Sequence, residues 1–175
     1  MKTLIVVDVE ADGPAPGLYS MVCFGAVAVE TNLNKTFYGK AKPLEIEGVR
    51  WDSSALRVSG FTREQHLQFP HPAVAMNNFD AWLRQFEQPI FISDNLAFDW
   101  QFVNYYFHAF GPKGNPFGWS GRRIGDMYGG MKGDIRAQWK HLRKTKHTHN
   151  PVDDAMGNAE ALLDIANQGL KGIII

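Results

Sequence analysis

Five side chains of this 175-residue chain have the types and spacing that a metal-assisted reaction needs, and the first two stand together. Asp8 and Glu10 end the apolar stretch "LIVVDVEADG" (residues 4–13) two positions apart, so on a strand both would point to the same face. Carboxylates that close repel each other, and a divalent cation with oxygen ligands, such as Mg²⁺ or Mn²⁺, removes the conflict. The spacing alone is weak support, because two acids can also simply solubilise the end of a strand.

The third acid, Asp99, lies in "SDNLAFDW" (residues 93–100), just after a short apolar segment. A helix is expected over 96–110 with Asn95 as its cap, which puts Asp99 in the first helical turn. A carboxylate there is either a metal ligand or a charge that interacts favourably with the helix dipole.

The remaining two candidates are His149 and Asp154, which flank the start of the last expected helix. A histidine on a loop beside a metal-binding carboxylate suits a general base, because its ordinary pKa is near neutrality and it can reach a water molecule. We expect Asp153 to match the helix dipole instead, and His141 and His147 to be surface residues of a basic segment.

Hydrophobic patterns predict the elements that must hold these side chains. Strands are expected at 3–10, 21–30, 35–43, 89–94 and 122–127, and helices at 72–87, 96–110 and 151–169, with short helical pieces within 48–65. The first strand is apolar without alternation, so it should be covered on both faces at the centre of a sheet. The order predicts an α/β fold in which helices flank a mixed five-stranded sheet.

Taken in order, the three acidic motifs resemble the DEDDh (DnaQ-like) family of 3′→5′ exonucleases. The matching stretches are "DVE" (8–10), "DNLAFD" (94–99) and "HNPVDDA" (149–155), with "GAVAVE" (25–30), "ALRVSGFT" (55–62) and "IGDM" (124–127) as further similarities. Asp94 departs from the pattern, because relatives often carry a histidine there. The resemblance implies a ribonuclease H-like fold, with three antiparallel strands plus parallel additions, in a single exonuclease domain over residues 1–175.

The same resemblance implies a role for each site residue. Four carboxylates would hold two divalent cations, Mg²⁺ or Mn²⁺: Asp8, Glu10, Asp99 and Asp154. Asp8 would bridge both ions, Glu10 and Asp154 would serve the ion that carries the attacking water, and Asp99 would support the other. His149 would take a proton from that water. Two ions about 3.5–4 Å apart can stabilise both the attacking and the leaving oxygen of a phosphoryl displacement.

Charge and aromatic residues suggest how a polymer would bind. The net charge is zero, but residues 111–149 hold nine Lys/Arg against two acids, which suits contact with a polyanion or forms a solvated face. Candidates to bind backbone phosphates are Arg122, Arg123 and Lys146. Candidates to wedge or stack on terminal bases are Leu18, Trp51 and Phe61, with core packing as the alternative.

We therefore expect a 3′→5′ exonuclease that releases nucleoside 5′-monophosphates from single-stranded RNA. Residues 121–155 are most similar to small standalone exoribonucleases of the polyadenylate-specific 3′-exoribonuclease AS group, which favours RNA over DNA. An exonuclease acting on DNA, a catalytically silent nucleic-acid-binding module and a metal-dependent phosphatase for small nucleotides are the alternatives. The intact acids and histidine argue against the silent module, and the basic segment argues against the phosphatase.

Composition bounds the remaining classes. The single cysteine, Cys23, excludes an intramolecular disulfide and a cysteine-based zinc site, and it should lie in the core. No apolar run approaches the roughly 18 residues of a membrane span, and the N-terminus lacks a signal-peptide pattern, so we expect a cytoplasmic protein with no membrane partner. Relatives are often homodimers, and the apolar tail at 173–175 could pack on a partner or on its own core.

Overall fold

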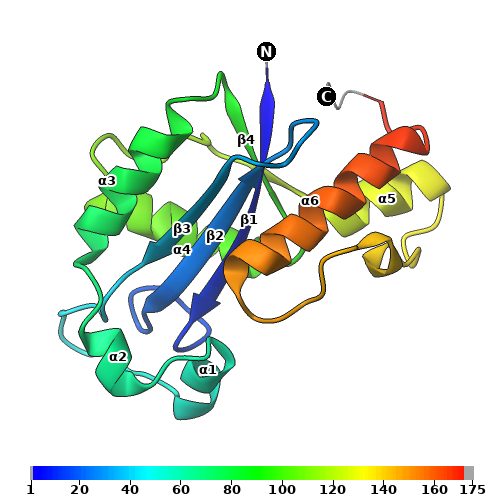
Figure 1. Cartoon of the computed structure of the whole chain (residues 1–175). Helices are drawn as coiled ribbons and strands as arrows, with labels where there is room; N and C mark the ends of the chain where they lie inside the picture. The colour runs from blue at the N-terminus through cyan, green and yellow to red at the C-terminus, as the bar shows by residue number, and fades with distance from the viewer. Residues whose placement is uncertain (1, 172–175) are drawn as a thin grey trace.

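Five strands form one mixed sheet in the computed structural model, which describes residues 2–171 (Figure 1). They are β1 (Thr3–Ala11), β2 (Met21–Ala28), β3 (Thr36–Lys40), β4 (Pro89–Ser93) and β5 (Gly121–Arg123). The order across the sheet is β3-β2-β1-β4-β5; β2 is antiparallel to both β1 and β3, while β4 is parallel to β1 and β5. The predicted sheet, with the first strand at its centre, is confirmed.

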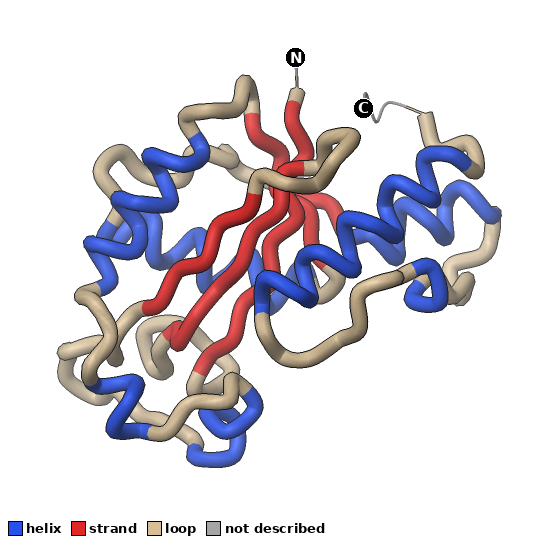
Figure 2. The backbone as a smooth tube through the Cα atoms, in the orientation of Figure 1, coloured by secondary structure: helices blue, strands red, loops and turns tan. Residues whose placement is uncertain are grey.

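Helices cover both faces of this sheet (Figure 1). They are α1 (Ser53–Val58), α2 (Arg63–Leu67), α3 (Pro72–Leu83), α4 (Leu96–Phe110), α5 (Ile124–Lys132) and α6 (Pro151–Asn167), with a 3₁₀ turn, η1, at Lys140–Leu142. The pair α3 and α4 packs on one face, and the pair α5 and α6 on the other. Figure 2 shows the short α1 and α2 in a loop-rich lobe beyond the C-terminal end of β1. None of the described helices has both the length and the apolar character to cross a membrane.

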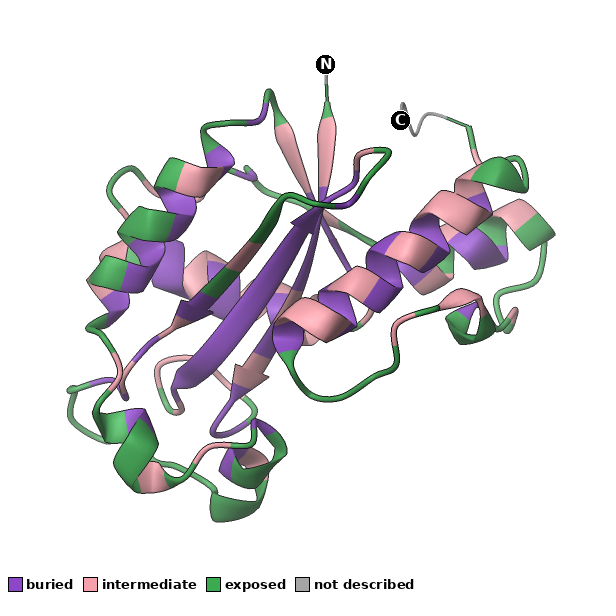
Figure 3. Ribbon diagram, viewed as in Figure 1, coloured by how far each residue is buried: buried purple, intermediate pink, exposed green. Residues whose placement is uncertain are grey.

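The two faces of β1 explain its unbroken apolar pattern. Ile5 and Val7 are fully buried in the core under α3 and α4, whereas Val6 is fully buried in the core under α5 and α6. Side chains alternate along a strand, so Asp8 and Glu10 continue the face that Val6 begins. The neighbouring β2 is buried along its whole length (Figure 3). The acids therefore appear where the apolar face ends, beside the first turn of α6.

Gly25 allows the start of α6 to lie close to the sheet. It pairs with Asp8 across β1 and β2, and a Cβ at this position would stand 2.4 Å from the carbonyl carbon of Pro151. No side chain fits in that space, so only glycine permits this approach. The close contact places the first turn of α6 directly next to Asp8.

Several local predictions need correction or lie outside the description. The strand expected at 122–127 ends at Arg123, because Ile124 and Tyr128 are both buried at helical spacing and begin α5. Asn95 occupies the N-cap of α4, but its side chain caps no backbone amide within the described residues. Cys23 is buried, as expected. The tail at 173–175 lies outside the described residues.

Candidate active site

Three carboxylates meet where the end of β1 faces the start of α6. Asp8, Glu10 and Asp154 each offer a ligand oxygen, and these atoms lie within 4.8 Å of one another. The side chain of Asp154 is buried, and that of Glu10 is 12% exposed. The packing of α6 across β1 and β2 thus brings together acids that are far apart in the sequence.

Asp99 stands beside this cluster but is held in another way. It is buried in the first turn of α4, where Oδ1 accepts a hydrogen bond from the backbone N–H of Val9 (3.1 Å) and Oδ2 accepts one from the Ser93 hydroxyl. Among the described residues it joins no group of three close ligand atoms. The structure therefore clusters three of the four predicted acids and places the fourth next to them with both oxygens in hydrogen bonds.

Burial and mutual repulsion raise the pKa values of three of these acids, Asp8, Glu10 and Asp99. Burial raises the pKa of Asp8 well above its usual range, and the neighbouring carboxylates, Asp99 most strongly, raise it further. Burial also raises the pKa of Glu10 to about 7, against the opposing effect of His149, and that of Asp99 to about 7, against its hydrogen bonds. An all-oxygen cluster whose charges repel one another fits a hard divalent cation, which would replace the protons.

His149 lies in the turn just before α6 with its ring toward the cluster. Its backbone N–H donates to Oδ2 of Asp154 (3.1 Å), and its ring Nδ1 is 3.4 Å from Oε1 of Glu10. The residue has a φ of 61°, a left-handed conformation that costs a residue other than glycine about 1–3 kcal/mol. The backbone of His149 is fixed by its hydrogen bond to Asp154, while its ring, in a side chain that is 48% exposed, reaches solvent. This arrangement suits a proton acceptor.

The loop that leads into His149 is fastened at two points. The carboxylate of Asp94 pairs with Lys140 (2.7 Å) and with Arg143 (3.1 Å). The carboxylate of Glu160, on α6, accepts hydrogen bonds from the backbone N–H and the hydroxyl of Thr145 (2.7 and 3.1 Å). Asp94 is the position that departs from the family pattern, and here it anchors the loop. Neither Asp94 nor Arg143 was selected by the sequence analysis, because each pairs with a residue more than 45 positions away.

Two of the predicted base-stacking residues lie on neighbouring loops beyond the end of β1. Leu18 is 51% exposed and Trp51 is 46% exposed, and the backbone joins them through an Arg50 N–H to Leu18 carbonyl hydrogen bond (2.8 Å). The guanidinium of Arg63 lies 5.0 Å from the centre of the Trp51 ring and forms a 3.2 Å ion pair with the buried Asp12. Arg63 thus contacts the Trp51 ring, and both Leu18 and Trp51 are open to solvent.

The predicted phosphate-binding residues do not gather in one place. Arg123 is next to the anchored loop, because its Nε donates to the Asp94 carbonyl (3.1 Å). Lys146 is exposed on the segment that leads to His149. Arg122 instead lines a hollow with Pro89, toward the N-terminal ends of β1 and β4 and away from the acids.

Two further side chains make contacts that bear on their predicted roles. Phe61 packs edge to face on Phe69, with ring centroids 4.9 Å apart, in a small cluster that includes Leu56, so the core-packing alternative fits it. His147 is exposed, as expected, but its Nδ1 also lies 2.8 Å from Oδ2 of Asp154. No local pattern could reveal this contact, because it depends on how the loop folds back over α6.

A mostly apolar cleft of about 300 Å³ opens beside Glu10. It is lined by Glu10, Ala11, Gly13, Pro14, Asp52, Ala55, Val58 and Phe98. No pattern in the sequence indicates this cleft, because the spacing of Phe98 with Phe102 on α4 is that of an ordinary core residue. The cleft offers an apolar pocket directly next to the acidic cluster.

Comparison with known proteins adds independent information. No family model matches the chain. A curated relative, the 3′-5′ DNA exonuclease Cap18 of Escherichia coli, is 34% identical over 173 residues, which cover 95% of this chain and 88% of that protein. Two solved structures are similar at 15% sequence identity. The nuclease domain of 3′hExo, a DEDDh family member bound to rAMP, matches with a TM-score of 0.77 over 97% of this chain and 94% of that chain. E. coli Exonuclease I in complex with a dT13 oligonucleotide matches with a TM-score of 0.71 over 98% of this chain and 42% of that chain. At these identities the two structures show the fold.

Proposed function

Because the chain belongs to the DEDDh family of 3′→5′ exonucleases, we propose that its substrate is single-stranded DNA, from which it releases nucleoside 5′-monophosphates. The choice of DNA is supported by the curated relative, a DNA exonuclease that aligns with 95% of this chain. The meeting of Asp8, Glu10 and Asp154 in one cluster is the observation that carries the assignment of the active site.

The clustered carboxylates would hold the divalent cations that this family uses. Asp8, Glu10 and Asp154 are the candidate ligands, since their oxygens converge and their repulsion favours a cation between them. When bound, such ions lower the pKa of a water molecule and stabilise charge on the phosphate. Asp99 would add negative charge beside the three clustered carboxylates. It would also hold the end of β1 in place by accepting the hydrogen bond from the Val9 N–H.

His149 would act as the general base on the attacking water. Its exposed ring can reach a water molecule, and its backbone is fixed to Asp154. A proton taken from water makes the ring positive, and the Glu10 carboxylate 3.4 Å away stabilises that charge when it is ionised. The water oxygen would then attack the last phosphate of the strand, and the bond to the preceding 3′-oxygen would break.

The cleft beside Glu10 would receive the terminal nucleoside of the strand. Its apolar lining, which includes Val58 and Phe98, gives contacts to a base that do not depend on sequence. Leu18 and Trp51 are exposed on the loops beyond the end of β1, and they are candidates to contact the next base of the nucleic acid. Lys146, exposed on the segment that leads to His149, is a candidate to bind backbone phosphate.

Single-stranded RNA is the second candidate substrate. The similarity of residues 121–155 to small exoribonucleases favours it. Discrimination for RNA requires a contact to the 2′-hydroxyl. Glu10 and Asp52 line the cleft, and either carboxylate can accept a hydrogen bond from a ribose hydroxyl.

The test is a comparison of DNA and RNA strands of the same sequence. Both carry a 5′ label and are incubated with the full chain and Mg²⁺ or Mn²⁺. A ladder that shortens from the 3′ end on DNA, with much slower shortening of RNA, is the expected result. Faster shortening of RNA would overturn the DNA proposal in favour of the second candidate. Binding of both strands without cleavage would indicate a silent module, and cleavage of mononucleotides alone would indicate a phosphatase.

A further inference from the structure

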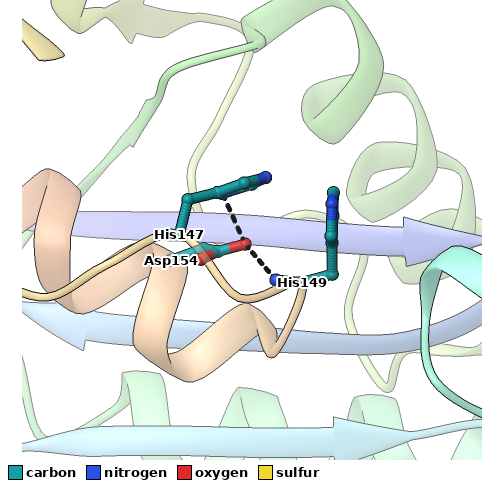
Figure 4. Close-up of side chains that lie close together, drawn as sticks. All are labelled: His147, His149 and Asp154. Atoms are coloured by element: carbon teal, nitrogen blue, oxygen red, sulfur yellow. Dashed lines mark hydrogen bonds and ion pairs between the residues drawn. The ribbon is translucent and has the colours of Figure 1, made fainter.

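We propose that His147, His149 and Asp154 form a binding site for a transition-metal ion such as Zn²⁺, and that occupation of this site inhibits the enzyme. The three side chains each offer one ligand atom, and these atoms lie within 4.8 Å of one another. Figure 4 shows the two histidines on either side of the Asp154 carboxylate. The set differs from the acidic cluster, because two of its three ligand atoms are imidazole nitrogens.

The positions of the rings are close to those that a zinc site needs. Nδ1 of His147 is 2.8 Å from Oδ2 of Asp154, and the two rings face each other edge to face with centroids 4.3 Å apart. Ligand atoms around a tetrahedral zinc ion stand about 3.3 Å apart, given bonds of about 2.0–2.1 Å. The side chains of His147 and His149 are 49% and 48% exposed, so small rotations of their rings can bring the three ligand atoms to this spacing.

The donor types select against the ions that the acidic cluster would take. Two imidazoles and one carboxylate are a zinc ligand set that leaves a fourth position open for water. Mg²⁺ prefers oxygen ligands, whereas Zn²⁺ binds imidazole well and exceeds Mn²⁺ in affinity for a given site. Asp154 belongs to both groups of ligands, so the two sites are adjacent.

Occupation of this site would remove two groups from the reaction. A nitrogen of His149 that donates its lone pair to a metal cannot accept a proton from water, and Asp154 would be drawn toward the new ion. This inhibitory effect rests on the proposed role of His149, whereas metal binding does not. A chelator that removes Zn²⁺ but leaves excess Mg²⁺ should restore the rate.

Binding is tested by calorimetric titration of Zn²⁺ into the full chain in excess Mg²⁺. We expect one site in the wild-type protein, at least about tenfold weaker binding in His147→Gln, and unchanged binding in His141→Gln. His141 is the matched control, because it is an exposed histidine on η1 in the same loop. Visible absorption of the Co²⁺-loaded protein should show nitrogen ligation that His147→Gln loses. No Zn²⁺ binding in Mg²⁺, or equal affinity in His147→Gln, would overturn the site.

Inhibition is tested by Zn²⁺ titration of the rate, each variant being normalised to its own rate in Mg²⁺ alone. The wild-type protein and His141→Gln should lose activity in the Zn²⁺ range found by calorimetry, and His147→Gln should need at least about tenfold more. Equal sensitivity of all three would show that Zn²⁺ acts at the acidic cluster and would overturn the inhibitory role. A protein that binds Zn²⁺ through His147 but degrades neither DNA nor RNA would refute the proposed function and leave the metal site standing.

Discussion

Replacement of Glu10 by glutamine should stabilise the metal-free protein above neutral pH, even though it damages the candidate metal site. Burial raises the pKa of this carboxyl from 4.5 to about 7. Between these values the folded chain keeps a proton that the unfolded chain releases, so the free energy of unfolding falls as the pH rises through this range. Glutamine has the same shape without the charge, so the variant should escape this loss.

The size of the effect follows from the two pKa values. They differ by about 2.5 pH units, which corresponds to up to about 3 kcal/mol once the pH is above both. For a chain of this length, that free energy corresponds to about 6–12 °C in the unfolding midpoint. At pH 5 the difference should shrink to about 1 kcal/mol or less, because Glu10 is then protonated in the folded protein.

Thermal unfolding followed by circular dichroism measures this effect. Wild-type protein and Glu10→Gln are compared in EDTA at pH 5 and pH 8, and again at pH 8 with Mg²⁺. We expect the variant to unfold at the higher temperature in EDTA at pH 8, and Mg²⁺ to stabilise the wild-type protein more than the variant. A variant no more stable than the wild type in EDTA at pH 8 would refute the reasoning. A difference in unfolding temperature between the two proteins that is as large at pH 5 as at pH 8 would refute it as well.

Three further substitutions test other parts of the site. His149→Ala should lower the turnover rate about 10²–10⁴-fold while Mn²⁺ binding, measured by calorimetry, persists; a near-normal rate would exclude the role as base. Gly25→Ala should cost about 1–3 kcal/mol in urea unfolding, because the added Cβ meets Pro151, and an unchanged midpoint would contradict the close packing. Asp94→Asn should cost about 1–3 kcal/mol by the same assay, since it leaves Arg143 without its partner; no loss would mean that the ion pair does not anchor the loop.

Much of the fold follows from local patterns. The unbroken apolar run before Asp8 indicates a strand covered on both faces, and the structure places it at the centre of the sheet. The spacing of Asp8 and Glu10 puts them on one face, because a strand has a period of two. Pro151 and the acids after it mark the start of the last helix, which begins where expected. These features depend on neighbours along the chain, which a single sequence displays.

The remaining features depend on contacts between distant segments. The hydrogen bonds of Asp99 to Val9 and Ser93 require α4 to begin against β1, and the pairing of His147 with Asp154 requires a loop to fold back over α6. The position of Arg122 in a hollow with Pro89 depends on the parallel pairing of β5 with β4. No spacing in the sequence encodes such contacts, so the cleft beside Glu10 and the second ligand set could be found only in three dimensions.

The most direct test of the active site is DNA degradation by Asp8→Asn beside a matched control. Asp164→Asn serves as the control, because Asp164 lies on α6 ten residues, or about 15 Å, beyond Asp154. With 5′-labelled single-stranded DNA and Mg²⁺, the wild type and Asp164→Asn should produce the same ladder, and Asp8→Asn should leave the strand intact while its circular dichroism spectrum is unchanged. Shortening of the strand by Asp8→Asn at the wild-type rate would contradict the assignment of this cluster as the active site.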